Sequence, residues 1–568
     1  MKKIFLFIAL ITVISAQLMF AQNNRSPRFS KPLYSTEESS RNPIGPPISV
    51  GEYPYFPYPY VNYDISNDST PQNEPSIKFS GKFPNIVVGA WRDFRTTINQ
   101  SDPIRRVGYS YSTNAGTSWS VSALTPITDP SHPRTSDAVV CSDTAGNFYI
   151  ATISIDITNG NGEVLIYKST DGGITFPVGY IAAGGNGNNE DKEWIACDLT
   201  HGSSPYKNNL YISWTRFGTP NGILFMKSSN GGVNWASPFL ISHESGVQGS
   251  DLTIGPNGDI YVIWLGGFSD DIIYFNKSTN GGTSFQTTDV IAGEGATPNV
   301  PFSQNGYLTF PSIATDISGG PRNGNIYVTW CDARNGDPDI FLSRSTNGGT
   351  NFSTAVRVNN DAVSNGKLQC WPWISVNETG NIAILYYDSR NTANNNIIEA
   401  WLARSTDGGI TFVNEKLSSV PSPTNQPNTA VRYGDYINVD YKGTRIVPIW
   451  TDERAGGYNM ETYTAIIDLA TEINPISGSI PDKFELSQNY PNPFNPITNI
   501  KYQIIENGFV NLKIYDIVGR EIATLVNKNQ TAGTYETKFD ASNISSGVYF
   551  YKLTSGSFSD VKKLVVVK

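Results

Sequence analysis

The stretch Ser345-Thr-Asn-Gly-Gly-Thr-Asn-Phe352 decides the fold, because variants of it recur along the chain. Five other copies begin at Ser112, Ser169, Ser228, Ser278 and Ser405. Successive copies start at similar intervals, so the pattern has a nearly regular period. A period of this kind is typical of repeat architectures, in which each repeat is one small unit of strands or helices.

Each copy has the composition of a hairpin lock between two strands. The Asp or Asn side chain can bond its own turn, Gly accepts a positive φ, and the final aromatic residue packs underneath. The Asp and Asn residues in question are Asn114, Asp171, Asn230, Asn280, Asn347 and Asp407. Short runs typical of β-strands precede every copy, as Asn325–Trp330 and Ile340–Leu342 precede the copy at Ser345. Four antiparallel strands per unit predict an all-β propeller.

The number of blades depends on how the last repeat closes. A further unit follows the sixth copy at residues 436–467, without a hairpin lock or a fourth strand of its own. A strand near Tyr60–Asp64 is a candidate to supply the missing strand and close the ring. Residues 61–470 are therefore expected to form the propeller. The length of this segment, compared with the spacing of the copies, favours seven blades, with six as the alternative.

The eight-residue pattern resembles the Asp box, or BNR repeat, of the sialidase-like propellers. In that family the box lies between the third and fourth strands of a blade, on the face away from the active site. The resemblance therefore implies a fold rather than a catalytic residue. True sialidases have six blades, which is the reason for keeping six as the alternative.

Composition agrees with an all-β protein and excludes other classes. The chain has 568 residues, 12% aromatic residues, 51 Gly and 35 Pro, a profile unlike a disordered chain or a helical bundle. With 50 acidic against 41 basic residues the net charge is −9, and no run is rich in Lys or Arg. We therefore expect no nucleic-acid partner.

The N-terminal segment has the order of a secretory signal peptide, expected over residues 1–21. Lys2 and Lys3 precede an apolar run that ends at Ile14, and cleavage is expected after Ala21 or Ala16. Residues 22–60 are rich in Pro, Ser and Asn and predict an extended leader. No later stretch has about 18 consecutive apolar residues, so no transmembrane segment is expected in the mature chain.

Residues 481–568 have a different pattern, reached through an expected linker at 471–480. Alternating runs separated by Gly519, Gly533 and Gly547 predict short strands. The segment resembles the type A C-terminal sorting domain of type IX secretion. The matching stretches are Asn489-Tyr-Pro-Asn-Pro-Phe-Asn-Pro496, Tyr515-Asp-Ile-Val-Gly-Arg520, Gly547-Val-Tyr-Phe550 and the tail from Lys562 to Lys568. The resemblance implies an immunoglobulin-like β-sandwich, the outer-membrane translocon as partner, and a secreted or cell-surface protein.

A second repeated motif, an aromatic residue followed by Asp-x-Arg, falls in the loops between second and third strands. Its arginines are Arg95, Arg334, Arg390 and Arg454. One interpretation is a ring of guanidinium groups that binds the carboxylate of an acidic sugar, as the arginines of sialidases do. The other is a set of Asp–Arg pairs that staple loops, which a motif repeated in many blades favours.

The starts of the first strands vary more between blades and supply the other site candidates. Expected catalytic groups are Asp137 and Asp435 as acid or base and Tyr433 or Tyr436 as nucleophile, as the sialidase resemblance implies. Trp194, Trp371 and Trp373 are candidates to stack on sugar rings, and Arg432 to bind substrate. An equal alternative for the aromatic residues is a plug that closes the axial channel.

One departure counts against catalysis: the Arg-Ile-Pro motif of sialidases is absent from the chain. Three hypotheses therefore stand: a glycoside hydrolase, a glycan-binding or adhesion module without catalysis, and a structural protein of the cell envelope. The first two take glycans or glycoproteins as partners.

Cysteine and metal chemistry make small contributions to the interpretation. In an exported protein Cys331 and Cys370 are the best disulfide candidates, whereas Cys141 and Cys197 are expected to be buried thiols. No histidine spacing suits zinc, and no cofactor is expected. The loop Asn335–Asp339 is compatible with a structural calcium ion.

Overall fold

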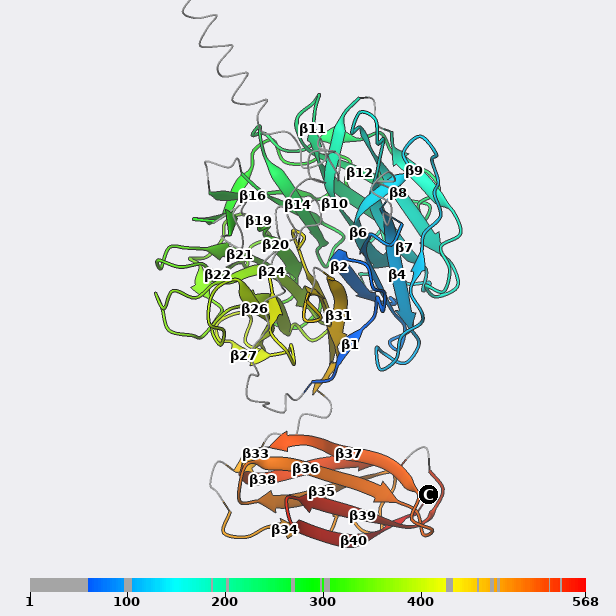
Figure 1. Ribbon diagram of the computed structural model, residues 1–568, viewed down its shortest axis with the longest axis vertical. Helices are drawn as coiled ribbons and strands as arrows, with labels where there is room; N and C mark the ends of the chain where they lie inside the picture. Colours follow the sequence, from blue (N-terminus) through cyan, green and yellow to red (C-terminus); the bar gives the residue numbers. More distant parts are fainter. Residues whose placement is uncertain are drawn as a thin grey trace, which may run out of the picture. The chain divides into compact units, whose positions relative to one another are not determined.

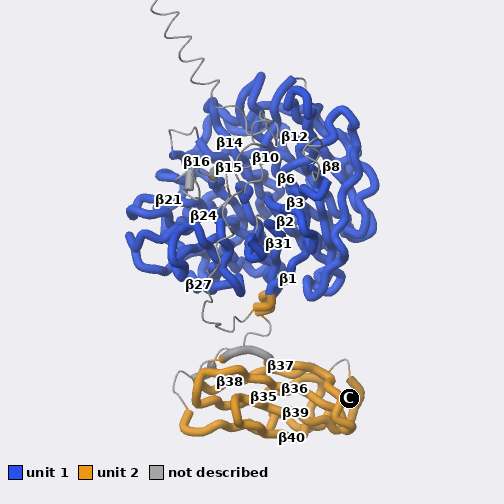
Figure 2. The backbone as a smooth tube through the Cα atoms, in the orientation of Figure 1, with its two compact units in different colours: residues 1–51, 62–466 blue, residues 52–61, 467–568 orange. Residues whose placement is uncertain are grey.

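The computed structural model describes residues 60–567, except 97–104, 185–186, 201–203, 267–270, 297–298, 301–306, 425–432, 457–458, 470–474, 478–480, 531 and 542–543. The expected signal peptide, almost all of the leader, most of the linker and Arg432 lie outside these residues. The chain divides into two compact units, of residues 62–466 and 467–568 (Figure 2). Within the described chain, no helix has the length and apolar character to cross a membrane.

Among the described residues, the first unit contains seven antiparallel sheets, each with a path of four hydrogen-bonded strands. The first three sheets are β2–β5 (Gln72–Phe79, Val87–Asp93, Arg106–Ser112, Ala123–Leu124), β6–β9 (Arg134–Ser142, Phe148–Ile155, Gly162–Ser169, Gly179–Ala183) and β10–β13 (Asn189–Cys197, Leu210–Phe217, Gly222–Ser228, Phe239–Leu240). The next two are β14–β17 (Gln248–Ile254, Ile260–Leu265, Ile272–Ser278, Val290–Glu294) and β20–β23 (Ser312–Thr315, Ile326–Asp332, Asp339–Ser345, Val356–Arg357).

The last two sheets carry one extra short strand each. The sixth is β24–β27 (Gln369–Val376, Ile382–Asp388, Ile397–Ser405, Val413–Lys416), with β28 (Ser422–Pro423) beside β26. The seventh is β29 (Asn438–Lys442), β30 (Arg445–Asp452), β31 (Glu461–Ala465) and β1 (Asn62–Asp64), with β32 (Ile467–Asp468) beside β30. A separate two-stranded pair joins β18 (Asn299–Val300) to β19 (Tyr307–Leu308).

The first strand of each sheet lies innermost, and these strands contact one another in a closed order. β2 contacts β6, and the series continues through β10, β14, β20 and β24 to β29, which contacts β2 again (Figure 1). A closed ring of four-stranded antiparallel sheets is a β-propeller. The predicted all-β propeller fold is confirmed.

Side-chain acceptors join neighbouring inner strands. Asp440 accepts the backbone N–H of Phe79 at 2.8 Å, and Ser76 Oγ accepts that of Val140 at 3.1 Å. The same relation joins Asp251 to the N–H of Ile313, Ser312 to that of Ile374, and Ser375 to that of Tyr441. In each case an N–H at the edge of one sheet is satisfied by the sheet before it, so the exposed edge is covered.

The ring closes where the first described strand joins the last sheet. β1 pairs antiparallel with β31, with Asn62 opposite Ala465 and Asp64 opposite Tyr463. The Asn62 side chain adds ties to the neighbouring blade: it donates to the carbonyl of Leu417 at 2.9 Å and accepts the N–H of Ser419 at 2.6 Å. The strand expected near Tyr60–Asp64 therefore supplies the missing fourth strand.

All six copies of the eight-residue pattern form the same hairpin between the third and fourth strands. The Ser hydroxyl donates to the Asp or Asn side chain at 2.7–3.0 Å and accepts a glycine N–H at 2.8–3.0 Å. The Asp or Asn oxygen also accepts the N–H four residues later at 2.9–3.2 Å. These hairpins define one end of the ring, the hairpin end; the inner strands begin at the opposite end, the mouth.

The second unit is a sandwich of two antiparallel sheets, β33-β38-β35-β34 and β37-β36-β39-β40. The strands are β33 (Pro475–Ser477), β34 (Glu485–Leu486), β35 (Ile497–Ile504), β36 (Gly508–Tyr515), β37 (Glu521–Gln530), β38 (Gly533–Asp540), β39 (Gly547–Ser555) and β40 (Phe558–Val566). One apolar core joins the two sheets, with Ile500 and Tyr502 from one and Leu512 and Leu553 from the other fully buried. The expected small β-sandwich is thus present.

The hairpin lock predicts a pH effect that depends on whether the acceptor is Asp or Asn. Burial alone would raise the pKa of Asp407, but hydrogen bonds from Thr411, Ser405 and Ile410 outweigh it and lower the pKa from 3.8 to about 2. A depressed carboxyl pKa stabilises the fold above the unfolded-state value and loses that effect as the pH falls through the folded-state value. Stability should therefore decline between pH 3.8 and about 2.

The variant Asp407→Asn should reduce this acid-dependent loss, because its hairpin then matches the four that use Asn. The reverse variant Asn347→Asp should increase it. Chemical denaturation at pH 6, 4 and 2.5 measures both effects. Equal pH profiles for the two variants would contradict the assignment.

Candidate functional site

The four described arginines of the repeated Asp-x-Arg motif lie at the mouth, each on its own blade. Their partners Asp93, Asp332, Asp388 and Asp452 end second strands and have side chains that are 0% exposed. In every case the Asp also accepts the backbone N–H of the arginine, at 2.7–2.9 Å. The motif therefore forms a closed turn with an internal ion pair.

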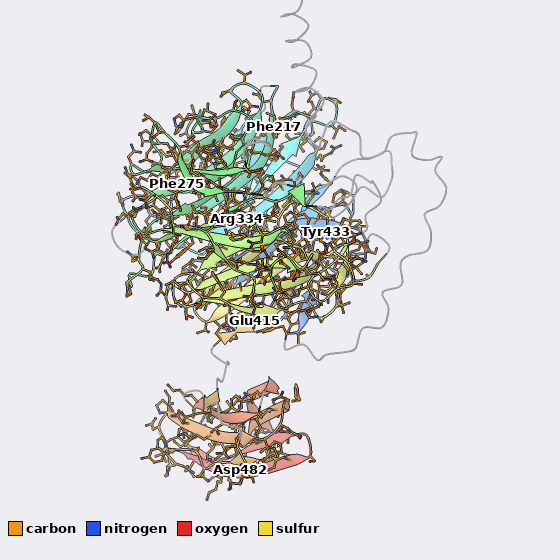
Figure 3. All side chains as sticks on the ribbon, turned by 90° about the vertical axis from the view of Figure 1, so that its left-hand side faces the viewer. Phe217, Phe275, Arg334, Glu415, Tyr433 and Asp482 are labelled. Carbon is orange, nitrogen blue, oxygen red and sulfur yellow. The ribbon has the colours of Figure 1, made fainter. Side chains whose placement is uncertain are left out.

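Aromatic side chains also contact this closed turn, which we call the staple. The indole N–H groups of Trp91, Trp330 and Trp450 donate to the same carboxylates at 2.9–3.1 Å. The guanidinium of Arg454 stacks 4.0 Å from the ring of Tyr463, and that of Arg390 stacks 4.1 Å from Trp401. Each of the arginines proposed as a binding ring thus pairs with an aspartate of its own blade, and Arg334, which is labelled in Figure 3, also donates to the carbonyl of Glu294 in the preceding blade.

β-Bulges near the starts of five inner strands change the direction in which their side chains point. Register shifts interrupt β2, β6, β10, β14 and β24 near their starts. At these bulges Glu74, Asp137, Lys192, Gly249 and Trp371 have positive φ values between 49° and 75°. A bulge re-aims the side chain it carries. Gly249 is required in its blade, because a Cβ there would lie 1.9 Å from Phe310.

Glu74 and Asp137 form a hydrogen-bonded carboxyl pair between the first and second blades. Burial, then the charges of Asp137 and Asp435, raise the pKa of Glu74 well above its usual range, although Arg92 opposes the shift. Burial also opposes ionisation of Asp137, but Arg92, Ser136 and the hydrogen bond from Glu74 outweigh it and lower its pKa. Glu74 therefore holds the proton and Asp137 the charge.

Arg92 and Arg105 adjoin this pair, and Arg134 lies near Arg105. Arg92 lies 3.1 Å from Glu74 and donates to Asn73 at 2.7 Å. Arg92 and Arg105 stand 5.4 and 5.9 Å from the ring of Phe94. Burial, followed by the like charges of Arg92 and Arg134, lowers the pKa of Arg105 well below its usual range. All three guanidinium groups belong to residues that are at most 6% exposed.

Lys192 occupies an aromatic cage on the axis. Its ammonium lies 4.2 Å from the ring of Trp194, 4.9 Å from Tyr436, 5.1 Å from Trp373 and 5.4 Å from Phe310. Burial lowers its pKa despite the charges of Asp251 and Glu193. Trp194 and Trp373 also stack on each other at 4.3 Å. Trp194 and Trp373 are 6% and 4% exposed, so both rings are packed in the interior.

The two candidate tyrosines differ in their bonding. Tyr433 shares a 2.6 Å hydrogen bond with Ser422, donates to the carbonyl of Thr451 at 2.9 Å and stacks on Trp371 with ring centroids 6.1 Å apart. Its hydroxyl is therefore used in packing. Tyr436 is 3% exposed, and its hydroxyl makes no hydrogen bond among the described residues. Burial and the charges of Asp137 and Glu74 raise the pKa of Tyr436.

The structure thus brings together Asp137, Asp435 and Tyr436 from the sequence-derived site, and adds Glu74 and Arg105, which sequence reasoning missed. Arg92 carried a readable signal, because the equivalent positions in the other copies of its motif are occupied by Cys331 and Thr451. Glu74 and Arg105 had no comparable signal in the sequence, because their positions depend on the bulge and on the order of the strands.

The cysteines and the Asn335–Asp339 loop both lie among the described residues. All four cysteines are free and buried, and the thiol of Cys331 donates to the carbonyl of Gln369 at 3.3 Å. The predicted disulfide to Cys370 is therefore not formed. In the loop Asn335–Asp339, the Asp339 carboxylate already accepts from Arg357 and Asn359, at 2.6 and 2.7 Å.

Residues 488–567 match the secretion system C-terminal sorting domain family. The chain therefore carries a type IX sorting domain and is exported to the cell surface or released from the cell. No curated protein matches the sequence.

Several solved structures resemble the chain at low identity. The leech intramolecular trans-sialidase is 12% identical over 62% of this chain and 69% of its own, with a TM-score of 0.40. PorZ, a surface component of the type IX secretion system of Porphyromonas gingivalis, is 16% identical over 89% and 60%, with a TM-score of 0.40. The BP39L lectin of Burkholderia pseudomallei is 11% identical over 72% and 97%, with a TM-score of 0.43.

The stapling role of the repeated arginines leads to a stability prediction. Arg454→Leu should lower the free energy of unfolding by about 3 kcal/mol, because the buried Asp452 carboxylate loses its counter-ion. Lys442→Met, which removes a 3.7 Å pair with the half-exposed Glu378, should cost under about 1 kcal/mol. Urea denaturation measures both. A small loss in Arg454→Leu would show that the staple contributes little.

Proposed function

We propose that this exported propeller recognises glycans that carry an acidic sugar, and that Arg92, Arg105 and Arg134 bind the sugar carboxylate. The observation that carries the proposal is the convergence of these three arginines from different elements at the mouth end. Planar guanidinium groups match a carboxylate with two parallel hydrogen bonds.

The energetics of burial support an anionic ligand. Buried like charges repel strongly in a medium of low dielectric, and an added anion relieves that repulsion. Burial lowers the pKa of Arg105 most, the charges of Arg92 and Arg134 lower it further, and those of Asp137 and Glu74 oppose them. The repeated arginines at the rim differ, because each pairs with a buried aspartate two residues before it.

Glu74 is the internal competitor for the ligand. Its carboxyl group lies 3.1 Å from Arg92, so a ligand carboxylate replaces it there. The raised pKa of Glu74 means that this carboxyl group ionises only as the pH rises, and ionisation strengthens its hold on Arg92. Affinity for an acidic sugar should therefore decrease as the pH is raised through the shifted pKa of Glu74.

Isothermal titration of the purified chain with 3′-sialyllactose, with lactose as the neutral comparison, tests the proposal. We expect binding of sialyllactose only, and at least a tenfold loss in Arg105→Gln, about 1.4 kcal/mol. Arg334→Gln removes a stapled arginine and should bind normally. Equal binding of the two sugars, or unchanged binding by Arg105→Gln, would contradict the proposal.

Hydrolysis is the second candidate function, and the carboxyl pair beside Tyr436 favours it. Two groups with pKa values shifted in opposite directions mark an acid and a base. Glu74 and Asp137 are in direct hydrogen-bond contact, closer than the roughly 5 Å of ordinary retaining glycosidases, so Tyr436 is the better nucleophile. Its raised pKa requires deprotonation by a neighbouring carboxylate such as Asp137.

Release of free sialic acid from sialyllactose distinguishes the two functions. A hydrolase should release sialic acid, and Tyr436→Phe should abolish release while retaining binding. If the unmodified chain binds sialyllactose but releases no sialic acid, its function is recognition without hydrolysis. The phenyl ring of Tyr436→Phe keeps its contacts with Lys192 and Trp194, which makes it a suitable variant.

A further inference from the structure

A cavity of about 300 Å³ lies on the propeller axis, toward the hairpin end. Residues from all seven inner strands line it, and its lining extends to the C-terminal ends of those strands. Trp194 and Trp373 line its inner side, and the same two rings enclose Lys192. The cavity is therefore separate from the arginine cluster at the mouth.

The burial pattern of the inner strands indicates solvent within this cavity. Most residues of these strands are fully buried, but Lys78, Thr253 and Ser375 are only half-buried. These strands are innermost in the ring, so the exposed parts of the three side chains face the axis rather than the outer surface. The cavity volume is at the lower end of the range for small-molecule sites.

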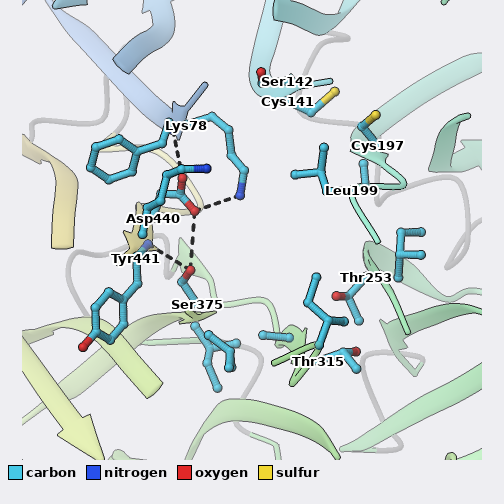
Figure 4. Close-up of a pocket in the computed structure, with 18 of the residues that line it drawn as sticks. Lys78, Cys141, Ser142, Cys197, Leu199, Thr253, Thr315, Ser375, Asp440 and Tyr441 are labelled. Carbon is cyan, nitrogen blue, oxygen red and sulfur yellow. Dashed lines mark hydrogen bonds and ion pairs between the residues drawn. The ribbon is translucent and has the colours of Figure 1, made fainter. Parts of the chain in front are cut away.

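One side of the cavity carries an ion pair with no net charge. Lys78 Nζ lies 2.8 Å from Asp440 Oδ1, and the Ser375 hydroxyl lies 3.5 Å from the same oxygen (Figure 4). Burial alone would lower the pKa of Lys78, but Asp440 outweighs it and raises the pKa. The pair offers donors and acceptors together, and it favours neither an anion nor a cation.

The other side carries hydroxyl groups, one of which has no partner among the described residues. Thr315 is 6% exposed, and its Oγ1 makes no hydrogen bond within that part of the chain. Thr253 and Thr315 lie across the cavity from Lys78 and Asp440 (Figure 4). A buried hydroxyl without a partner costs roughly 1–3 kcal/mol, a cost that a ligand hydrogen bond removes.

Apolar and weakly polar groups complete the lining. Leu199, Cys141 and Cys197 lie between the two polar sides (Figure 4). Burial raises the thiol pKa values of both cysteines, so they remain protonated and act as small apolar groups rather than as metal ligands.

We propose that this axial cavity binds a neutral polyhydroxylated molecule of monosaccharide size. Such a ligand presents hydroxyl groups to Thr315 on one side and to the Lys78–Asp440 pair on the other, and its C–H surface contacts Leu199. The neutral ion pair explains why an uncharged ligand fits better than an acidic sugar. This site is independent of the acidic-glycan function proposed for the mouth.

Binding of D-glucose, D-galactose and D-mannose to the purified chain, measured by saturation-transfer NMR and titration calorimetry, tests the inference. At least one sugar should bind, and Thr315→Val should weaken it about fivefold through loss of one hydrogen bond. Thr309→Val is the matched control, because Thr309 is also buried and without a hydrogen bond among the described residues but does not line the cavity. Leu199→Trp should abolish binding by filling the space.

Substitutions in the lining locate the bound sugar. Leu199→Trp and Thr315→Val should both weaken neutral-sugar binding, and Thr309→Val should leave it unchanged. Binding of none of the three sugars, or unchanged binding by both Leu199→Trp and Thr315→Val, overturns the inference. Arg105→Gln should keep neutral-sugar binding, so failure at the mouth and failure in the cavity are distinguishable.

Discussion

The propeller depends on hydrogen bonds from backbone N–H groups of inner strands to side chains of the preceding blade. The innermost strand of a blade has one edge without a pairing partner, and such an edge is costly when it lies in the interior. Asp440, Ser76, Asp251, Ser312 and Ser375 satisfy five of these edges with short polar side chains. Because every acceptor reaches the next blade, the spacing and order of the blades are fixed at the axis.

The same arrangement explains why charges at the rim and charges at the axis behave differently. At the rim, Asp452 and Arg454 come from one short turn and pair within it, and Arg454 also donates to Ser419 of the neighbouring blade. At the axis, Glu74, Asp137 and Arg105 come from three different elements, and their contacts exist only after the ring has assembled. The axial charge pairs therefore depend on the assembled ring, whereas the rim pairs form within a single turn.

The sequence was sufficient for the features that depend on local chemistry. The hairpins followed from residues such as Ser345, Asn347 and Gly349, whose hydrogen bonds span at most four positions. The staple followed from Asp332 and Arg334 for the same reason. The axial cluster was only partly predictable: Asp137 and Tyr436 were identified, whereas Glu74 and Arg105 were not. Their positions depend on a bulge at positive φ and on contact between β2 and β6, which no local pattern encodes.

Closure by β1 and β31 joins the two ends of the propeller sequence in a single pair of strands. The last sheet therefore stays incomplete until almost the whole propeller sequence has been made, and contacts of such long range form slowly. During that interval the edge of β31 is open to pairing with other chains. The N-terminal strand is consequently a latch: its three residues bury little, yet they cover this edge and complete the last sheet of the ring.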